Sequence, residues 1–306
     1  MRYDVLVIGD ANPDLVLRGD VRPRFGQEEQ LLDAADLVLG GSAAITAAGC
    51  ARLGLRTALL AAVGPDVFGA FTRERLAERG VELLDRAGDG TPTGLSVILS
   101  APGDRAILTL PGTIPALRPE DVTGELLGAA RHVHVASLFL QPALRAGLAG
   151  VFARARSEGL TTSLDTNWDP SGRWTGLEEI LAVTDVFLPN AAELLAVTGA
   201  AGVDEAAKGL VALGTTVVLK DGARGGRAWW PGGETAAPGL AVDVVDTTGA
   251  GDSFNAGFLA ARLGGRDVPA AVAWAAAAGS LSTRAAGGTA AQASAAEVEA
   301  VIPSAR

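Results

Sequence analysis

The chain has 306 residues and a net charge of −10, and 48% of its residues are hydrophobic while 20% are charged. This composition excludes a disordered chain and supplies enough apolar material for a large core. The negative charge disfavours nucleic acid and anionic membranes as partners, because both are polyanionic. The single cysteine, Cys50, excludes an intrachain disulfide and a cysteine-based zinc cluster. No secretion signal or membrane-length apolar run is recognisable, so we expect a cytoplasmic protein.

Apolar segments rich in β-branched residues alternate with amphipathic or alanine-rich segments along most of the chain. This alternation is typical of parallel strands joined by crossover helices, and it predicts an α/β fold. Several strands are continuous apolar runs, as expected when both faces of a sheet are covered. The expected strands span residues 3–8, 57–63, 132–136, 161–164, 186–188 and 216–219, and the expected helices span residues 42–53, 71–79, 143–157, 191–197, 204–213, 251–263 and 268–283.

The first strand is followed by the sequence GDANPD at residues 9–14. Ligands contact open α/β sheets at the carboxyl ends of their strands, which makes Asn12 and Asp14 candidate ligand-binding residues. An ordinary turn is the alternative, since Asn, Pro and Asp all favour turns.

Paired glycines, Gly40 and Gly41, precede an alanine-rich helix in the sequence GGSAAITAAGCARLG at residues 40–54. Glycines at such a position let a ligand approach the backbone closely. Taken alone, the segment also fits an ordinary loop that enters a buried helix.

Two parts of the chain interrupt the alternation of strands and helices. One is the segment 14–19, and the other is a pair of strands at 94–100 and 105–110 joined by the turn sequence APGD. Proline and glycine at the turn indicate a β-hairpin. Because no helices separate these strands, we expect them to form a small separate β-layer that covers a cleft as a lid.

Two further segments follow predicted strands in the second half of the chain. The sequence PNAAE at residues 189–193 opens a helix, and its Asn190 and Glu193 have the spacing of a capping box. The sequence KDGARG at residues 220–225 ends another strand, where Lys220 could be either a ligand-binding residue or a surface lysine.

The most informative segment is DTTGAGDSFNAG at residues 246–257, which opens an apolar helix. Its glycines allow a tight turn, and the free N–H groups and dipole of the helix N-terminus favour a bound anion. An aspartate in the first helical turn, Asp252, fits both a capping role and a catalytic role when it is judged from its position alone.

Taken together, these segments resemble the PfkB family of ribokinase-like carbohydrate and nucleoside kinases, and the resemblance runs from residue 5 to residue 289. The segment 246–257 closely resembles the second family signature, residues 40–54 resemble the first, and residues 190–193 resemble the Asn-x-x-Glu element. The sequence DTN at residues 165–167 is similar to an Asp-x-Asn segment of sugar kinases in this family. The resemblance implies one ribokinase-like domain over residues 1–306, a three-layer α/β/α core, and lid strands inserted from about 14–19 and 94–110.

The resemblance also implies a chemistry: transfer of the γ-phosphoryl group of ATP, with Mg²⁺, to a hydroxyl of a sugar-like molecule. It assigns Asp252 as the general base, and Gly249, Ala250 and Gly251 as donors of amides to the transferred phosphoryl group. The remaining implied roles are acceptor binding by Asn12, Asp14, Gly40, Gly41 and Ile45, nucleotide binding by Asn190, Lys220, Gly222 and Gly225, Mg²⁺ binding through water by Glu193, and a monovalent-cation site for K⁺ at Asp246 and Thr248.

One residue departs from the family pattern: Ile45 stands where the family commonly has Asn. The acceptor is not identified by any motif, so a nucleoside kinase and a non-catalytic sugar-binding sensor stay as alternatives. We expect a small-molecule substrate, no nucleic acid or membrane partner, and a homodimer formed through the β lid.

Overall fold

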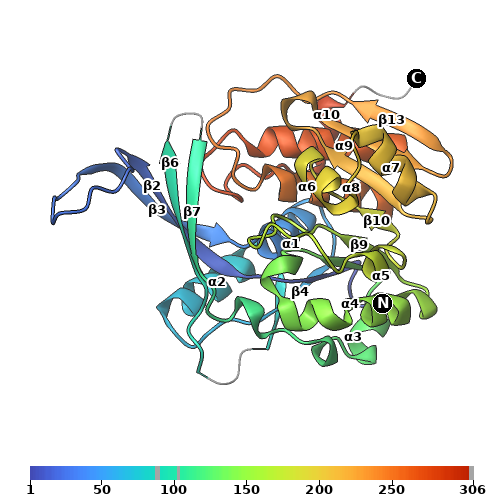
Figure 1. Cartoon of the computed structure of the whole chain (residues 1–306), viewed down its shortest axis with the longest axis horizontal. Helices are drawn as coiled ribbons and strands as arrows, with labels where there is room; N and C mark the ends of the chain where they lie inside the picture. Colours follow the sequence, from blue (N-terminus) through green and yellow to red (C-terminus); the bar gives the residue numbers. More distant parts are fainter. Residues whose placement is uncertain (87–89, 102–103, 303–306) are drawn as a thin grey trace.

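A nine-stranded sheet forms the centre of the protein in the computed structural model, which describes residues 1–86, 90–101 and 104–302 (Figure 1). Its strand order is β13-β12-β11-β10-β9-β8-β1-β4-β5, and all pairs are parallel except β11–β12 and β12–β13. The strands are β1 (Val5–Ile8), β4 (Thr57–Ala61), β5 (Glu82–Asp85), β8 (His132–Val135), β9 (Thr161–Leu164), β10 (Val186–Phe187), β11 (Thr216–Lys220), β12 (Gly226–Trp230) and β13 (Gly233–Ala237).

Helices cover both faces of this sheet and give the expected three layers. Along β1, the side chains of Val5 and Val7 join one hydrophobic core while Leu6 and Ile8 join the other, because successive strand residues point to opposite faces. The first core also contains residues of α1 (Ser42–Arg52), α2 (Val67–Glu78), α8 (Ala250–Leu263), α9 (Val268–Ser282) and α10 (Ala295–Val301). The second contains residues of α3 (Gly124–Gly128), α4 (Pro142–Ser157), α5 (Glu178–Leu181), α6 (Ala191–Thr198) and α7 (Val203–Val211).

A second sheet of four strands projects from the core (Figure 1, blue and teal). Its order is β3-β2-β6-β7, built from β2 (Asn12–Gly19), β3 (Leu32–Gly40), β6 (Leu95–Ala101) and β7 (Asp104–Leu110). The prediction of a separate β-layer is confirmed, although the sequence analysis missed β3. The predicted turn residues 102–103 lie outside the described residues.

Most predicted helices are present within one or two residues of their expected bounds. The exception is α2, which begins at Val67 rather than at residue 71, because the Asp66 side chain accepts a hydrogen bond from the Gly69 N–H (2.8 Å) and caps the helix earlier. The sequence analysis also missed β5, β12, β13, α3, α5 and α10. Short 3₁₀ turns lie at Ile114–Ala116, Pro119–Asp121, Leu138–Leu140 and Gly222–Arg224. No helix in the described ranges has both the length and the apolar character needed to cross a bilayer.

The two histidines of the chain lie side by side within the large sheet. His132 bonds to the hydroxyls of Thr161 and Ser163, and His134 bonds to the same Ser163 hydroxyl, each at 2.7 Å. Burial lowers the pKa of His132 to about 3 and that of His134 to about 4. Both rings are therefore neutral at pH 7 and are held by strand hydroxyls.

The carboxyl ends of the parallel strands meet along one edge of the sheet. Asp10 follows β1, Asp165 follows β9 and Asn190 follows β10, while Lys220 is the last residue of β11. A parallel bridge between Asn190 and Lys220 ties two of these ends together. Ligands of open α/β sheets bind at this edge, and the predicted site residues gather here.

Candidate active site

Helix α8 begins in a glycine turn that leaves no room for a side chain. Gly249 has a φ of 70°, and a Cβ atom there would lie 2.6 Å from the Cα of Gly288. Within the described residues, no side chain caps α8, and the first N–H groups of a helix have no acceptor inside it. The Ala250 N–H donates to the Thr247 carbonyl (3.2 Å). The amides of Gly249 and Gly251 are thus the better placed of the three predicted donors to meet an anion.

Asp252 lies in the first turn of α8 and its side chain is almost fully buried, with 8% exposed. The Ser42 hydroxyl donates a hydrogen bond to its Oδ1, and Asn167 in turn donates to Ser42 Oγ (3.0 Å). Burial and the nearby charge of Asp165 raise the pKa of Asp252 to about 7, while the Ser42 bond and Lys220 oppose the rise. A carboxylate with this pKa is well matched to accept a proton at neutral pH.

A buried ion pair lies beside Asp252. Lys220 Nζ is 2.5 Å from Asp165 Oδ2, which also accepts a hydrogen bond from Asn255 Nδ2 (2.6 Å). Only 12% of the Lys220 side chain is exposed, so it is not a surface lysine. Burial lowers the pKa of Lys220, but Asp165 and Glu193 outweigh that effect and the pKa is raised, so the amine is charged. The site therefore holds a fixed cation at the end of β11.

Asn190 and Glu193 form the predicted capping box at the start of α6. The Asn190 side chain accepts from the Glu193 N–H (2.9 Å), and the Glu193 carboxylate accepts from the Asn190 N–H (2.8 Å). Only one Glu193 oxygen is used in the box. The side chain is buried, which raises its pKa, and Lys220 opposes that rise. Asn190 and Glu193 therefore cap α6, and the second carboxylate oxygen of Glu193 can bind another partner.

Asn12, Asp14, Gly40 and Gly41 lie together where the small sheet joins the core. Asn12 Nδ2 donates to Asp14 Oδ1 (3.0 Å), and a Cβ on Gly40 would lie 2.0 Å from that same oxygen. Gly41 has a φ of 86°. Burial, with a further contribution from the charge of Asp10, raises the pKa of Asp14 to about 7. The glycines thus make room for a buried polar pair, and the positive charge of Arg105 opposes the rise in the pKa of Asp14.

Ile45 points towards the turn that precedes α8. A Cβ on Gly288 would lie 2.5 Å from Ile45 Cδ1, and one on Gly249 would lie 3.0 Å from Ile45 Cγ2. The side chain is 3% exposed. It therefore packs against the glycine turn, with little surface left for a ligand in this state of the protein.

Asp246 and Thr248 form a compact loop next to the same turn. Asp246 accepts hydrogen bonds from the Thr248 N–H and hydroxyl (2.9 and 2.8 Å) and from the Gly287 N–H (2.9 Å). Burial raises the pKa of Asp246, but these bonds outweigh it and the pKa is lowered. Arg105, on lid strand β7, donates to Thr248 Oγ1 (3.1 Å). Strand β7 of the small sheet thus places a cationic side chain next to Thr248.

Lys220, Gly222, Gly225 and Gly251 line one cavity of about 230 Å³. Its other walls come from the segment before α8 and from α8 and α9. They are mostly apolar (Leu240, Val242, Val244, Phe254, Ala276 and Gly279), with the hydroxyl groups of Thr247, Ser280 and Thr283 among them. Val244 is 62% exposed. An apolar slot that ends at a lysine and an uncapped helix suits a flat apolar ring attached to phosphates.

The structure adds three residues that the sequence analysis did not select: Asp10, Ser42 and Arg105. Asp10 accepts from the Ser42 and Ala43 N–H groups (3.2 and 2.9 Å) and caps α1. Ser42 meets Asp252 across 210 residues of sequence. Only Asp10 has a sequence signal, because it follows a strand directly. In the described ranges, no group of three or more acidic, histidine or cysteine side chains could hold a metal ion.

Known proteins similar to this chain fall in one family. The model described as "pfkB family carbohydrate kinase" matches residues 2–295. The ATP-dependent ribose-1-phosphate kinase of Halopiger xanaduensis is 34% identical over 281 residues, 90% of this chain and 90% of that protein. The fructokinase of Klebsiella pneumoniae is 31% identical over 275 residues, 85% of this chain and 84% of that protein.

The comparison with solved structures agrees with this family match. The solved structure of Arabidopsis thaliana ribokinase complexed with ribose and ATP has a TM-score of 0.84 at 25% identity, with 100% of both chains covered. With a family model matched over nearly its whole length and a close curated relative, the chain belongs to the pfkB family of carbohydrate kinases, which are phosphotransferases with an alcohol as acceptor.

Proposed function

We propose that the protein transfers the γ-phosphoryl group of ATP to a hydroxyl of a sugar-like acceptor, with Asp252 as general base. The observation that carries this proposal is a buried carboxylate of pKa about 7 in the first turn of an uncapped helix. Asp252 takes the proton of the acceptor hydroxyl while the hydroxyl oxygen forms a bond to the γ-phosphorus. The bond between that phosphorus and the β-phosphate oxygen breaks, and ADP leaves. The Gly249 and Gly251 amides and the Lys220 ammonium stabilise the negative charge on the transferred group.

The residues present fit ATP and Mg²⁺. The cavity bounded by Lys220, Gly222 and Gly225 has apolar walls for a base, and the amino end of α8 has free amides for phosphates. Mg²⁺, when bound with ATP, neutralises charge on the phosphates. A metal held through phosphates and water needs few protein carboxylates, which agrees with the single free oxygen of Glu193. Asp246 and Thr248 are the residues we assign to a monovalent cation such as K⁺.

The acceptor lies, on this proposal, between Asn12, Asp14 and Asp252, beneath the small sheet. Asn12 and Asp14 hold its hydroxyls, and the sheet acts as a lid that excludes water, which would otherwise compete as the acceptor. Arg105 reaches this space from the lid and makes an anionic sugar the favoured acceptor. One relative is named a ribose-1-phosphate kinase, which has such an acceptor, and another a fructokinase, whose acceptor is neutral.

A transfer assay with ATP and Mg²⁺ tests the proposal on ribose, ribose 1-phosphate, fructose, 2-keto-3-deoxygluconate and adenosine. We expect phosphorylation of sugars, with the anionic ones preferred. Arg105→Gln should reduce kcat/KM for an anionic acceptor by about 10–100-fold while changing that for a neutral one little, since a charge-assisted contact is lost. Preference for adenosine would identify a nucleoside kinase. Sugar binding without transfer would identify a sensor.

A further inference from the structure

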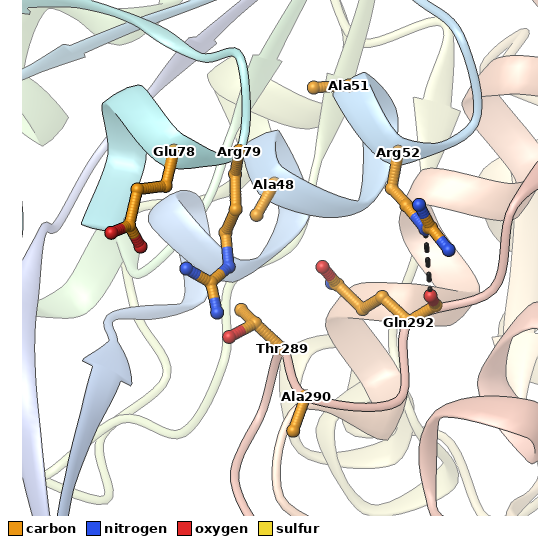
Figure 2. A pocket seen from close by; sticks show the side chains of 8 residues that line it. All are labelled: Ala48, Ala51, Arg52, Glu78, Arg79, Thr289, Ala290 and Gln292. Carbon is orange, nitrogen blue, oxygen red and sulfur yellow. Dashed lines mark hydrogen bonds between the residues drawn. The ribbon is translucent and has the colours of Figure 1, made fainter. Parts of the chain in front are cut away.

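A second cavity, of about 490 Å³, lies beside the carboxyl-terminal half of α1 (Figure 2). It is lined by α1 (Ala48, Ala51 and Arg52), by the end of α2 (Glu78 and Arg79), and by Thr289, Ala290 and Gln292 from the segment between α9 and α10. It shares no lining residue with the cavity bounded by Lys220. Its volume lies in the range of roughly 300–1,000 Å³ that is usual for small-molecule sites.

Two guanidinium groups give this cavity a positive character. Figure 2 shows the Arg79 guanidinium directed towards Thr289 and the Arg52 guanidinium towards Gln292. In the described part of the chain, no carboxylate lies within 4 Å of the Arg79 guanidinium, which donates only to the Arg75 carbonyl (3.1 Å). Burial lowers the pKa of Arg79, although the group stays charged at pH 7.

Two acidic side chains lie nearby. Glu78 lines the cavity and pairs with Arg75 (2.9 Å), and its charge opposes the fall in the pKa of Arg79. Glu297 is 3.8 Å from Arg52, and both side chains are about half exposed, so this contact is weak. The floor consists of Ala48 and Ala51, whose short side chains leave space for the carbon skeleton of a ligand. Arginine side chains suit the planar or tetrahedral oxygens of a carboxylate or phosphate, and the phosphate takes more donors.

One wall of the cavity is also a wall of the active site. Gln292 Nε2 donates to the Ile45 carbonyl (2.9 Å) and to Ser253 Oγ (3.3 Å), so it links α1 to α8 next to Asp252. In the same segment, Gly288 packs against the Gly249 turn and the Gly287 N–H bonds Asp246. A ligand that moves Thr289 or Gln292 must therefore also shift the turn proposed to hold the transferred phosphoryl group.

We propose that this cavity binds a small organic phosphate monoester, with its phosphate between Arg52 and Arg79, and that the bound ester changes the rate of phosphoryl transfer through the segment 287–292. The binding site does not depend on the function proposed above. The effect on rate rests on that function, so the two are measured separately.

Binding is tested by calorimetry with glycerol 3-phosphate as probe and glycerol as the neutral control, at constant ionic strength. A non-hydrolysable ATP analogue and the acceptor are present at saturation, so that the active site is blocked. We expect one probe molecule per chain, at least 10-fold weaker binding to Arg79→Gln and to Arg52→Gln, and no change for Arg156→Gln. Arg156 lies on α4, on the other face of the sheet, and pairs with Asp185 (3.4 Å). No binding, displacement by the analogue, or equal binding to all variants would overturn the site.

The effect on rate is measured as kcat and KM with and without glycerol 3-phosphate. We expect a change in the wild type that is not competitive with ATP or acceptor and that is lost in Arg79→Gln. Binding without any change in kcat or KM would overturn the effector role. If the arginines serve only to offset the partial negative charge at the carboxyl ends of α1 and α2, the variants will lower the melting temperature and leave probe binding unchanged, which also overturns the proposal.

Discussion

At the scale of single residues, the Asp252 side chain combines two properties: it can take a proton, and it holds a fixed place beside Ser42. The Asp252→Asn substitution separates these two properties. The amide keeps the shape and can still accept the Ser42 hydrogen bond, but it cannot take a proton. We expect kcat to fall by roughly 10²–10⁴-fold while acceptor binding persists. Steady-state kinetics and calorimetry measure the two effects. Asp204→Asn, an exposed aspartate paired with Arg227, is the control. Turnover close to that of the wild type would exclude Asp252 as the base.

The raised pKa of Asp252 also predicts how the protein responds to pH. Its pKa of about 7 in the folded state stands above the ordinary value of 3.8, so kcat/KM should rise with pH until about 7 and then level off. The folded state holds this proton more tightly than the unfolded state. Its stabilising effect is therefore full below pH 4 and is lost as pH rises through 7. We expect Asp252→Asn to raise the melting temperature at pH 8 but not at pH 4. An equal shift at both pH values would contradict the assignment.

Ile45 offers a test of acceptor choice at the same scale. Its alkyl side chain cannot pair with a hydroxyl, and burying one against it would cost roughly 1–3 kcal/mol. We expect ribose to be a poor acceptor for the wild type and a better one for Ile45→Asn, measured as kcat/KM. Because Ile45 packs against Gly249 and Gly288, the substitution will also lower the melting temperature. A fall in melting temperature with unchanged acceptor preference would show that Ile45 serves packing alone.

At the scale of elements, the capping box of α6 has a matched control elsewhere in the chain. Ser294 and Glu297 form the same box at the start of α10, far from the carboxyl ends of the strands. On the role proposed for Glu193, which is to orient water bound to Mg²⁺, Glu193→Gln should raise the Mg²⁺ concentration for half activity by roughly 10–100-fold. Glu297→Gln should cost stability only. Identical effects of the two variants on the metal dependence, measured by titrating Mg²⁺ in the transfer assay, would leave Glu193 with a capping role alone.

The helices and strands also show which parts of the fold could be predicted from the sequence and which could not. Apolar runs predicted β1, β8 and β11, the capping box predicted α6, and the glycine turn before an apolar segment predicted α8, because these features are local. Strands β12 and β13 were missed since GRAWW and GETAA are mixed in polarity, and β13 also lies at the sheet edge. Strand β3 was missed since most of its residues are exposed. Asp252 could be selected from its turn, whereas its contact with Ser42 could not, since nothing local links two residues so far apart.

At the scale of the whole molecule, the four-stranded sheet exposes apolar side chains. Leu37 and Leu108 lie on one face of the sheet, in the register Leu37–Leu15–Val97–Leu108, and are 39% and 60% exposed, and such a patch favours a partner. We expect a homodimer through the lid, with about twice the 30.8 kDa mass of one chain, measured by sedimentation equilibrium. Leu108→Glu should give monomers. Leu213→Glu, equally exposed at 60% but at the end of α7, should leave the dimer intact. A wild type that stays monomeric at all concentrations would contradict this arrangement.

The position of β1 in the middle of the large sheet has a consequence for synthesis. The first strand made on the ribosome pairs with β4 early but must wait for β8, and the Ser42–Asp252 contact must wait for α8. Contacts of such long sequence separation form late and slowly. Nascent chains that end before residue 250 would therefore contain the proposed acceptor-binding residues and the small sheet. They would lack Asp252, the proposed base, and the complete glycine turn. Catalytic activity should thus appear only after α8 has left the exit tunnel, which makes turnover a stringent reporter of the folding of the large sheet and its helices.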